Sequence, residues 1–214
     1  MRLPGVYAPQ DDSEFLLDVV SDHGLPPGAR VLDIGTGTGR VALGLARAGA
    51  GEVLAIDRSR RAVWAARCNA WSMRQRVLVR RGDLCSGAEG EFDVVVSNPP
   101  YVPCATGTPG RHSRARAWDA GADGRALLDR ICIAAPERLA PGGTLWLVHS
   151  TLSDPGKTLA LLHDAGLAAE VAARALIPFG PVLRSRAGWL LEQGLIAPGQ
   201  SMEELVVVKA SRCG

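Results

Sequence analysis

The residues with the clearest chemical potential form the run Asn98-Pro99-Pro100-Tyr101, which directly follows the apolar segment 92–97. Proline fixes φ, lacks an amide N–H and pushes the preceding residue away from helical backbone. The turn is therefore stiff, and it is expected to hold the Asn98 side chain and the Pro99 carbonyl side by side. Two adjacent acceptor oxygens can bind both hydrogens of a planar –NH₂ group.

An amide or aniline-like nitrogen is a weak nucleophile because its lone pair is delocalised. When the two oxygens accept hydrogen bonds from both N–H groups, electron density returns to the nitrogen and its lone pair is aimed at an electrophilic methyl group. This is catalysis by positioning and preorganised hydrogen bonding. Tyr101 would offer a flat face to the planar group. We predict Asn98, Pro99 and Tyr101 as catalytic residues. The structural alternative is a rigid end of a strand with Tyr101 packed away.

A glycine loop lies upstream, where residues 35–39 read Gly-Thr-Gly-Thr-Gly between a predicted strand and a predicted helix. Glycines allow a tight turn and close approach of a ligand, and open parallel sheets bind ligands at the carboxyl ends of their strands. The loop alone fits a dinucleotide or S-adenosylmethionine (SAM). Asp33 favours SAM, because a carboxylate repels a pyrophosphate but suits a cationic amino group. We predict that Asp33, Gly35 and Gly37 bind SAM, with a turn role for Asp33 as the alternative.

Two further acids follow predicted strands. Asp57 can accept two hydrogen bonds from a ribose diol, an interaction that NAD and SAM enzymes share. Asp83 could accept from an adenine amine while Leu84 packs on the ring. The alternatives are an acid at a helix amino terminus for Asp57 and a turn residue for Asp83.

The elements that must position these residues alternate along the chain. The predicted strands are 30–34, 53–56, 77–79, 92–97, 144–149, 168–173 and 205–208, and the predicted helices begin at Asp11 and span 40–48, 59–71, 123–139 and 154–165. Pro141-Gly142-Gly143 is expected to stop the helix 123–139. This alternation predicts an α/β, Rossmann-like fold with a seven-stranded, mostly parallel sheet and helices on both faces.

The chain is expected to form one domain over residues 1–214, with an amino-terminal arm and helix at 1–29. An insert is expected at 176–201, between the last two strands. Leu183, Ala187 and Leu190 fall at helical spacing within it. The favoured interpretation is a helix that packs over the sheet edge, and a substrate lid is the alternative.

The composition is typical of a globular protein, with 214 residues, 47% hydrophobic and 21% charged residues, and a net charge of +2. The five cysteines show no Cys-x-x-Cys spacing, so neither a disulfide framework nor a metal site is predicted. We see no secretory signal and no apolar stretch of about 18 residues that could span a membrane. A cytoplasmic location is expected, with no membrane partner.

With these motifs together, the chain resembles class I SAM-dependent methyltransferases with an Asn-Pro-Pro-Tyr motif. It is most similar to the HemK-type glutamine methyltransferases, which N-methylate the glutamine of the Gly-Gly-Gln motif in translation release factors. The run Val6-Tyr7-Ala8-Pro9-Gln10-Asp11-Asp12-Ser13 looks like the Tyr-x-Pro-x-x-Asp-Ser/Thr arm of the compact branch that lacks the helical amino-terminal domain. Residues 118–124 look like the family's Trp-x-Gly-Gly-x-x-Gly stretch, with Ala120 in place of a glycine.

The resemblance implies roles for individual residues. The SAM contacts would come from Ser13, Asp33, Gly35, Gly37, Asp57, Asp83, Leu84 and Asn98. Asn98 and Tyr101 would hold the substrate amide. Compact relatives can also require a small zinc-binding activator protein.

Several functions remain open at this point. Protein glutamine N-methylation leads, with a release factor as a candidate substrate. The alternatives are N-methylation of an exocyclic amine in DNA or RNA, methylation of a small metabolite enclosed by residues 176–201, a binding module without activity, and an NAD-dependent oxidoreductase. Weak basicity and few aromatic residues disfavour nucleic acid. A loop with Arg111, His112, Arg114 and Arg116 could nevertheless form a basic rim, although a solvated loop is the favoured interpretation.

Overall fold

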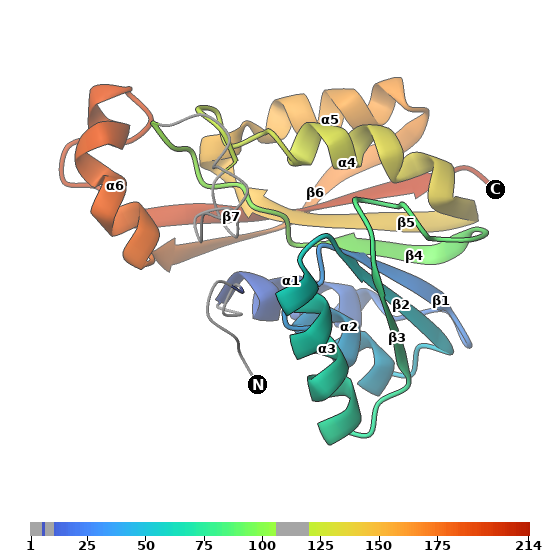
Figure 1. Ribbon diagram of the computed structural model, residues 1–214. Coiled ribbons are helices and arrows are strands. Elements are labelled where there is room, and N and C mark those ends of the chain that lie inside the picture. The colour runs from blue at the N-terminus through green and yellow to red at the C-terminus, as the bar shows by residue number, and fades with distance from the viewer. Residues whose placement is uncertain (1–5, 7–10, 106–119) are drawn as a thin grey trace.

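The computed structural model describes residue 6, residues 11–105 and residues 120–214. Its strands are β1 (Arg30–Ile34), β2 (Glu52–Asp57), β3 (Val77–Arg81), β4 (Phe92–Ser97), β5 (Leu139–Ser150), β6 (Leu167–Pro178) and β7 (Met202–Arg212). Within the described residues they form a seven-stranded sheet in the order β3-β2-β1-β4-β5-β7-β6 (Figure 1). All neighbouring strands are parallel except β7, which is antiparallel to both β5 and β6. The predicted mostly parallel sheet is confirmed.

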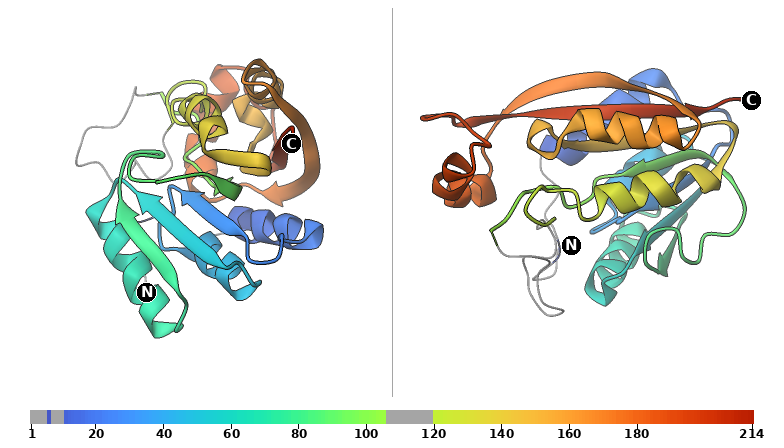
Figure 2. Two further views of the ribbon diagram at one scale, coloured as in Figure 1. Left: turned by 90° about the vertical axis from the view of Figure 1, so that its right-hand side faces the viewer. Right: turned by 90° about the horizontal axis from the view of Figure 1, so that it is seen from above.

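Helices cover both faces of the sheet (Figures 1 and 2). They are α1 (Asp11–His23), α2 (Arg40–Arg47), α3 (Arg60–Ser72), α4 (Leu128–Ala134), α5 (Pro155–Asp164) and α6 (Pro181–Glu192). On one face, α1, α2 and α3 bury residues such as Leu16, Val41 and Val63. On the other, α4 and α5 bury Ile131 and Leu162. Strands buried on both faces read as continuous apolar runs, which explains why the strands were recognisable in the sequence.

The order of the strands decides where a ligand can bind. From β1 the chain adds β2 and β3 on one side and then returns to place β4 on the other side. The two crossovers diverge at the carboxyl ends of β1 and β4, and such a switch point is where open α/β sheets bind ligands. The glycine loop follows β1, and the Asn-Pro-Pro-Tyr turn follows β4. The fold therefore brings both predicted motifs to the same edge of the sheet.

The predicted helix 123–139 is wrong in its extent. The helix is limited to α4, and a short 3₁₀ turn, η2 (Pro136–Arg138), follows it. Gly121 and Gly124 have φ values of 85° and 72°, which are incompatible with a helix, so the chain turns before α4 begins. Pro141-Gly142-Gly143 does not stop a helix, because it lies inside β5.

The last two strands are longer than predicted, so the segment between them is residues 179–201 rather than 176–201. Its helix α6 does not pack over the sheet edge. A small core of its own joins Phe179, Leu183, Leu190 and Ile196 to the partly buried Val102 and Leu152. The segment therefore extends past the ends of β6 and β7, beside the residues that follow the Asn-Pro-Pro-Tyr turn (Figure 1).

Candidate functional site

The glycine loop is a set of left-handed turns anchored to β2. Gly35, Gly37 and Gly39 have φ values of 76°, 57° and 85°, a region that side chains with a Cβ rarely adopt. The amides of Gly35 and Thr36 donate to the Ile56 carbonyl at 2.8 and 3.0 Å. A Cβ added at Gly35 or Gly37 would meet no atom within 4 Å, so open space lies over the loop.

Asp33 lies beneath this loop and is only 1% exposed. Its Oδ2 accepts from the Thr36 hydroxyl at 2.6 Å and from the Ala42 amide at 3.2 Å. Burial raises the pKa of Asp33 to about 6 against the opposing effect of these bonds. The carboxyl group therefore fastens the loop to α2, which is the turn role considered above. Its contact with a SAM amino group remains a prediction.

Asp57 bridges two loops at the carboxyl end of β2. Oδ2 accepts from the Gly37 amide at 2.9 Å and Oδ1 from the Ser59 amide at 2.8 Å. Burial raises the pKa of Asp57, and the two amide bonds act in the opposite direction. Each carboxylate oxygen has two lone pairs, so both can still accept from a diol seated beside Gly37.

Asp83 has a partner that the sequence did not indicate. Its side chain is half exposed and forms an ion pair with Arg130 at 2.7 Å. Leu84 has a φ of 52° and packs against the core beneath the sheet. The adenine contacts predicted for Asp83 and Leu84 therefore depend on residues that also serve the packing of α4.

The Asn-Pro-Pro-Tyr turn is fixed to its neighbours from the first residue. The Ser97 hydroxyl donates to the Ile34 carbonyl at 2.7 Å, which ties the end of β4 to the start of the glycine loop. The Asn98 Nδ2 donates to Ser13 Oγ at 3.0 Å. Ser13, predicted to bind SAM, is therefore brought against the predicted catalytic residue.

Tyr101 is only 7% exposed and belongs to the main core. Its hydroxyl donates to Asp12 Oδ2 at 3.1 Å, and its carbonyl accepts from the Ser153 hydroxyl at 2.7 Å. Little of the ring is available to a substrate group in this conformation. Tyr101 fixes the far end of the turn, and its role as a substrate platform stays a prediction.

Two acids near this turn were missed. Asp12 is 2% exposed and Glu203, on β7, is 5% exposed. Burial raises the pKa of Glu203 to about 7; a bond to Ser150 lowers it, and the Asp12 charge raises it. Asp12 stands in the arm motif and could have been noticed there. Glu203 begins an ordinary strand sequence, Glu-Glu-Leu-Val-Val-Val, that gives no signal.

A buried arginine supports the turn from the other side. Arg125 is 2% exposed, and its Nη1 donates to the carbonyls of Ser153 and Asp154 and to the Thr158 hydroxyl. Its Nε forms an ion pair with Asp129 at 2.7 Å. Arg125 thereby holds the 3₁₀ turn η3 (Thr151–Ser153), whose Ser153 binds the Tyr101 carbonyl.

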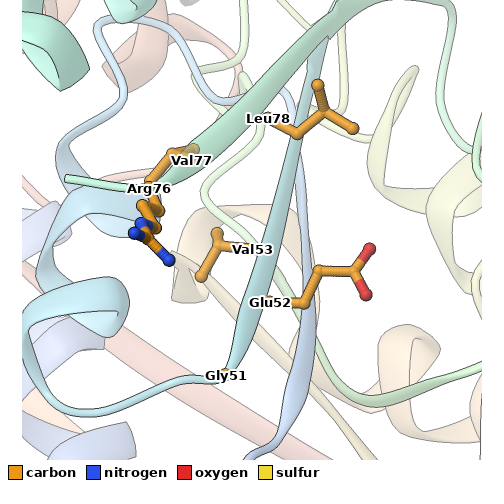
Figure 3. Close-up of a pocket in the computed structure, with 6 residues that line it drawn as sticks. All are labelled: Gly51, Glu52, Val53, Arg76, Val77 and Leu78. Carbon is orange, nitrogen blue, oxygen red and sulfur yellow. The ribbon is translucent and has the colours of Figure 1, made fainter.

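A shallow hollow of about 350 Å³ lies elsewhere, between Gly51, Glu52, Val53, Arg76, Val77 and Leu78 (Figure 3). These residues form the amino-terminal ends of β2 and β3, whereas Asp57 ends β2 at its carboxyl side. The hollow therefore belongs to the opposite end of the sheet from the predicted site.

Tyr7, the basic loop residues Arg111, His112, Arg114 and Arg116, and Trp118 lie outside the described residues. In the part of the chain that is described, no group of three His, Cys, Asp or Glu side chains could hold a metal ion. Over the same residues, no helix has the length and apolar character required to cross a membrane.

Comparison with known proteins identifies the family of this chain. The family model described as the methyltransferase small domain matches residues 1–108. A Methanocaldococcus jannaschii protein, provisionally named a protein N5-glutamine methyltransferase, is 34% identical over 82% of this chain and 88% of its own length. The release factor glutamine methyltransferase of Mycolicibacterium smegmatis is 35% identical over 75% of this chain. The match spans only 60% of that relative's length.

A solved structure agrees along nearly the whole chain. The E. cuniculi Mtq2–Trm112 complex, described as responsible for methylation of the eRF1 translation termination factor, superposes with a TM-score of 0.68 and 25% identity. The match covers 97% of this chain and 99% of that one. The mostly parallel seven-stranded sheet of this chain is thus shared with a methyltransferase of known structure. The chain belongs to the SAM-dependent methyltransferases of the HemK-type glutamine methyltransferase family.

Proposed function

We propose that this enzyme methylates the side-chain amide nitrogen of a protein glutamine, with the Gly-Gly-Gln motif of a translation release factor as the substrate. The observation that carries the proposal is the bond from Asn98 Nδ2 to Ser13 Oγ at 3.0 Å. With its nitrogen engaged there, Asn98 has Oδ1 left for the substrate, and the Pro99 carbonyl of the same turn is the proposed second acceptor. Two acceptors match the two N–H donors of a primary amide.

The residues around the glycine loop fit SAM. We propose that the SAM amino group lies near Asp33, the ribose diol near Asp57 and Gly37, and the adenine near Asp83 and Leu84. The open space over the loop and the remaining acceptor capacity of the Asp57 carboxylate support this assignment. When bound, SAM supplies an electrophilic methyl group.

The chain's own groups then orient the substrate. Asn98 Oδ1 and the Pro99 carbonyl accept hydrogen bonds from the two N–H groups of the amide. These bonds direct the nitrogen lone pair toward the methyl group. The N–CH₃ bond would form as the S–CH₃ bond of the sulfonium breaks, which would leave a neutral thioether, and the methylated nitrogen would then release one proton to solvent. The fixed turn lowers the activation barrier by positioning the amide, so no strong base is required.

The names of the relatives support this substrate class over nucleic acid or a metabolite. The M. jannaschii relative is named for protein glutamine, and the M. smegmatis relative for a release factor. The match covers 88% of the length of the M. jannaschii relative but only 60% of that of the M. smegmatis relative. The substrate is therefore proposed from the site and the M. jannaschii relative together.

The test is methyl transfer from radiolabelled SAM to a purified release factor, with peptide mass spectrometry of the product. We expect one methyl group on the glutamine of the Gly-Gly-Gln motif. A release factor with that glutamine changed to alanine is the matched control and should stay unlabelled. Labelling of the control, or of an adenine-containing oligonucleotide in place of the protein, would contradict the proposal.

We also propose that residues 1–214 act as one catalytic domain in which the 179–201 segment forms a wall of the substrate entrance. Arg186 on α6 donates to the Pro103 carbonyl at 3.0 Å, and the α6 core includes Val102. The segment is therefore joined to the residues directly after the catalytic turn. Arg186→Ala should raise KM for the release factor more than it lowers kcat.

A small zinc-binding activator protein is proposed as a partner. The supporting observation is a pair of exposed tryptophans on α3, the helix beside the edge strand β3, where Trp71 is 84% and Trp64 51% exposed. Apolar groups gathered at a strand edge are typical of a covered surface. The similar Mtq2 structure is a complex with Trm112.

Co-expression with a Trm112-type protein tests this partner. We expect the two to co-purify, and Trp71→Glu to abolish co-purification. Ile133→Glu, at a residue 67% exposed on the opposite face of the sheet, is the matched control and should not affect it. Equal loss in both variants would contradict the proposed surface.

A further inference from the structure

Both polar ends of the Asn-Pro-Pro-Tyr turn bind the first turn of α1. Asn98 Nδ2 donates to Ser13 Oγ at 3.0 Å, and the Tyr101 hydroxyl donates to Asp12 Oδ2 at 3.1 Å. These partners are 85 and 89 residues apart in sequence. Asp12 and Ser13 therefore form a connected polar unit with the turn that carries the chemistry.

The charge of Asp12 sets the direction of the hydrogen bonds in this unit. Asp12 Oδ1 lies 2.6 Å from the Ser13 amide and 3.3 Å from Ser13 Oγ. An ionised carboxylate only accepts hydrogen bonds, so the Ser13 hydroxyl must direct its proton to Asp12. Ser13 Oγ is then an acceptor toward Asn98, which turns the Asn98 nitrogen to Ser13 and its oxygen to the other side.

The opposite direction would block the reaction. A neutral group at position 12 can donate to Ser13, and the Ser13 hydroxyl can then donate to Asn98. The Asn98 side chain would flip, because its oxygen and nitrogen occupy nearly the same shape. Its –NH₂ group would then face the –NH₂ group of the substrate, donor against donor.

Glu203 is a neighbouring buried carboxyl group that can hold a proton in place of Asp12. It is 5% exposed, it bonds to Ser150, and its Oε2 has no hydrogen-bond partner among the described residues. Two buried carboxyl groups that interact do not both ionise readily, and the one with fewer donors holds the proton. Asp12 has donors from Ser13 and Tyr101, so the proton belongs on Glu203, consistent with its raised pKa.

Two further charged residues flank Asp12 on its own helix. Asp11 is exposed, and Glu14 is exposed and pairs with Arg40 of α2. Neither takes part in the bonds that link Asp12 to the catalytic turn, and both lie in water, where charges are screened.

We infer that Asp12 is a positioning residue for methyl transfer: its carboxylate, acting through the Ser13 hydroxyl, holds the Asn98 amide with its oxygen toward the substrate. Glu203 is the neighbouring carboxyl that holds the proton in place of Asp12. This inference rests on the proposed amide substrate for the meaning of the orientation. The bonds themselves can be tested without any substrate.

The first experiment uses nuclear magnetic resonance, because the chain has only two asparagines, Asn69 and Asn98. Labelling asparagine with ¹⁵N gives two side-chain amide signals, and Asn69 is an internal reference because its Nδ2 donates to the Thr38 carbonyl at 2.9 Å. We expect Asp12→Ala to speed hydrogen exchange of the Asn98 amide at least tenfold and to leave Asn69 unchanged. Alanine is used here because an introduced asparagine would add a third signal.

Unchanged exchange at Asn98 would overturn the inference, whatever the substrate proves to be. If Asp12→Ala fails to fold, which the Asn69 signal reports, Ser13→Ala makes the same test because it removes the linking hydroxyl. Ser13→Thr keeps the hydroxyl and should restore slow exchange.

The second experiment measures kinetics with the release factor. Asp12→Asn keeps the shape of the side chain but adds a donor, so we expect kcat to fall at least tenfold while the Kd for SAM stays within twofold. Asp11→Asn makes the same charge change on the exposed neighbour and should keep kcat within twofold. A normal kcat in Asp12→Asn, or a Kd for SAM that rises as much as kcat falls, would overturn the positioning role. An inactive wild-type protein would instead refute the proposed substrate.

Discussion

The two buried acids of the glycine loop, Asp33 and Asp57, bind groups at most 20 residues away, whereas the Asn-Pro-Pro-Tyr turn binds α1 across more than 80 residues. Asp33 reaches Thr36, three residues away, and Asp57 reaches Gly37, 20 residues away. Asn98 and Tyr101 reach α1 across 85 and 89 residues. The cofactor side is therefore assembled from local turns, and the catalytic side from the packing of distant elements.

This difference has a physical consequence for substitutions. A local loop needs little chain closure to form, so it depends mainly on its own glycines and acids. The catalytic turn needs α1, η3 and β4 in their final positions, so a change in any of them alters its geometry. Substitutions on the two sides should consequently separate cofactor affinity from turnover.

The largest expected effect tests the catalytic side directly. Asn98→Ala removes one of the two acceptors for the substrate amide and the bond to Ser13. We expect kcat to fall at least 100-fold, or about 2.7 kcal/mol in the barrier, while SAM still binds. Single-turnover kinetics and calorimetry with SAM measure the two quantities. A near-normal rate would remove the distinction between the two sides.

The next effect tests whether the turn is held from a distance. A Cβ at Gly124 would lie 2.3 Å from the Tyr101 carbonyl oxygen and 2.5 Å from Ser153 Oγ. We expect Gly124→Ala to lower both kcat and the free energy of unfolding. Gly121→Ala is the matched control, because Gly121 also has a positive φ but its nearest contact would be 3.6 Å.

Chemical denaturation of both variants isolates the steric part of this effect. Gly124→Ala should be less stable than Gly121→Ala by about 2 kcal/mol, the cost of a core overlap. Equal stabilities would mean that the Tyr101 carbonyl moves without penalty and that the turn is less rigid than proposed.

On the cofactor side, Asp57→Ala should weaken SAM binding at least tenfold, or ~1.4 kcal/mol, because it removes the ribose acceptor and the bond to Gly37. Asp83→Ala should have a smaller effect of about twofold, since Asp83 is half exposed and exposed charges contribute little. Calorimetry gives both dissociation constants. An unchanged value for Asp57→Ala would refute its assignment.

The smallest expected effect is a pH dependence of the free energy of unfolding that arises from Glu203. The pKa of Glu203 is about 7 in the folded protein and 4.5 as an unperturbed group, so between these values the folded protein binds more protons than the unfolded chain. The free energy of unfolding of the wild type, relative to Glu203→Gln, should therefore fall as pH rises from about 4.5 to about 7. We expect a fall on the order of 1 kcal/mol, because relaxation absorbs part of the burial cost.

Urea denaturation at several pH values measures this difference. Other buried groups, such as Asp33 and His149, titrate in both proteins and cancel. A difference that is constant with pH, or that rises with pH, would show that Glu203 is not the protonated member of the carboxyl pair.

Much of the architecture was predictable because it follows from periodicity. The strands β1, β2 and β4 are short apolar runs ended by glycine, aspartate or proline, and these signals act within a few residues. The helix predicted at 123–139 was wrong in its extent because it included Gly124, whose φ of 72° does not fit a helix. Only the approach of Tyr101 and Ser153 explains why the chain must turn there.

The candidate site divides in the same way. The sequence by itself determined the glycine loop, the acid after β2 and the Asn-Pro-Pro-Tyr turn, since backbone stiffness and short-range bonds define them wherever they occur. Only the tertiary structure decided that Ser13 faces Asn98, that Tyr101 is anchored to Asp12, and that Glu203 lies buried beside them. Such contacts depend on which distant elements share a face of the sheet, and no local pattern in the chain encodes that.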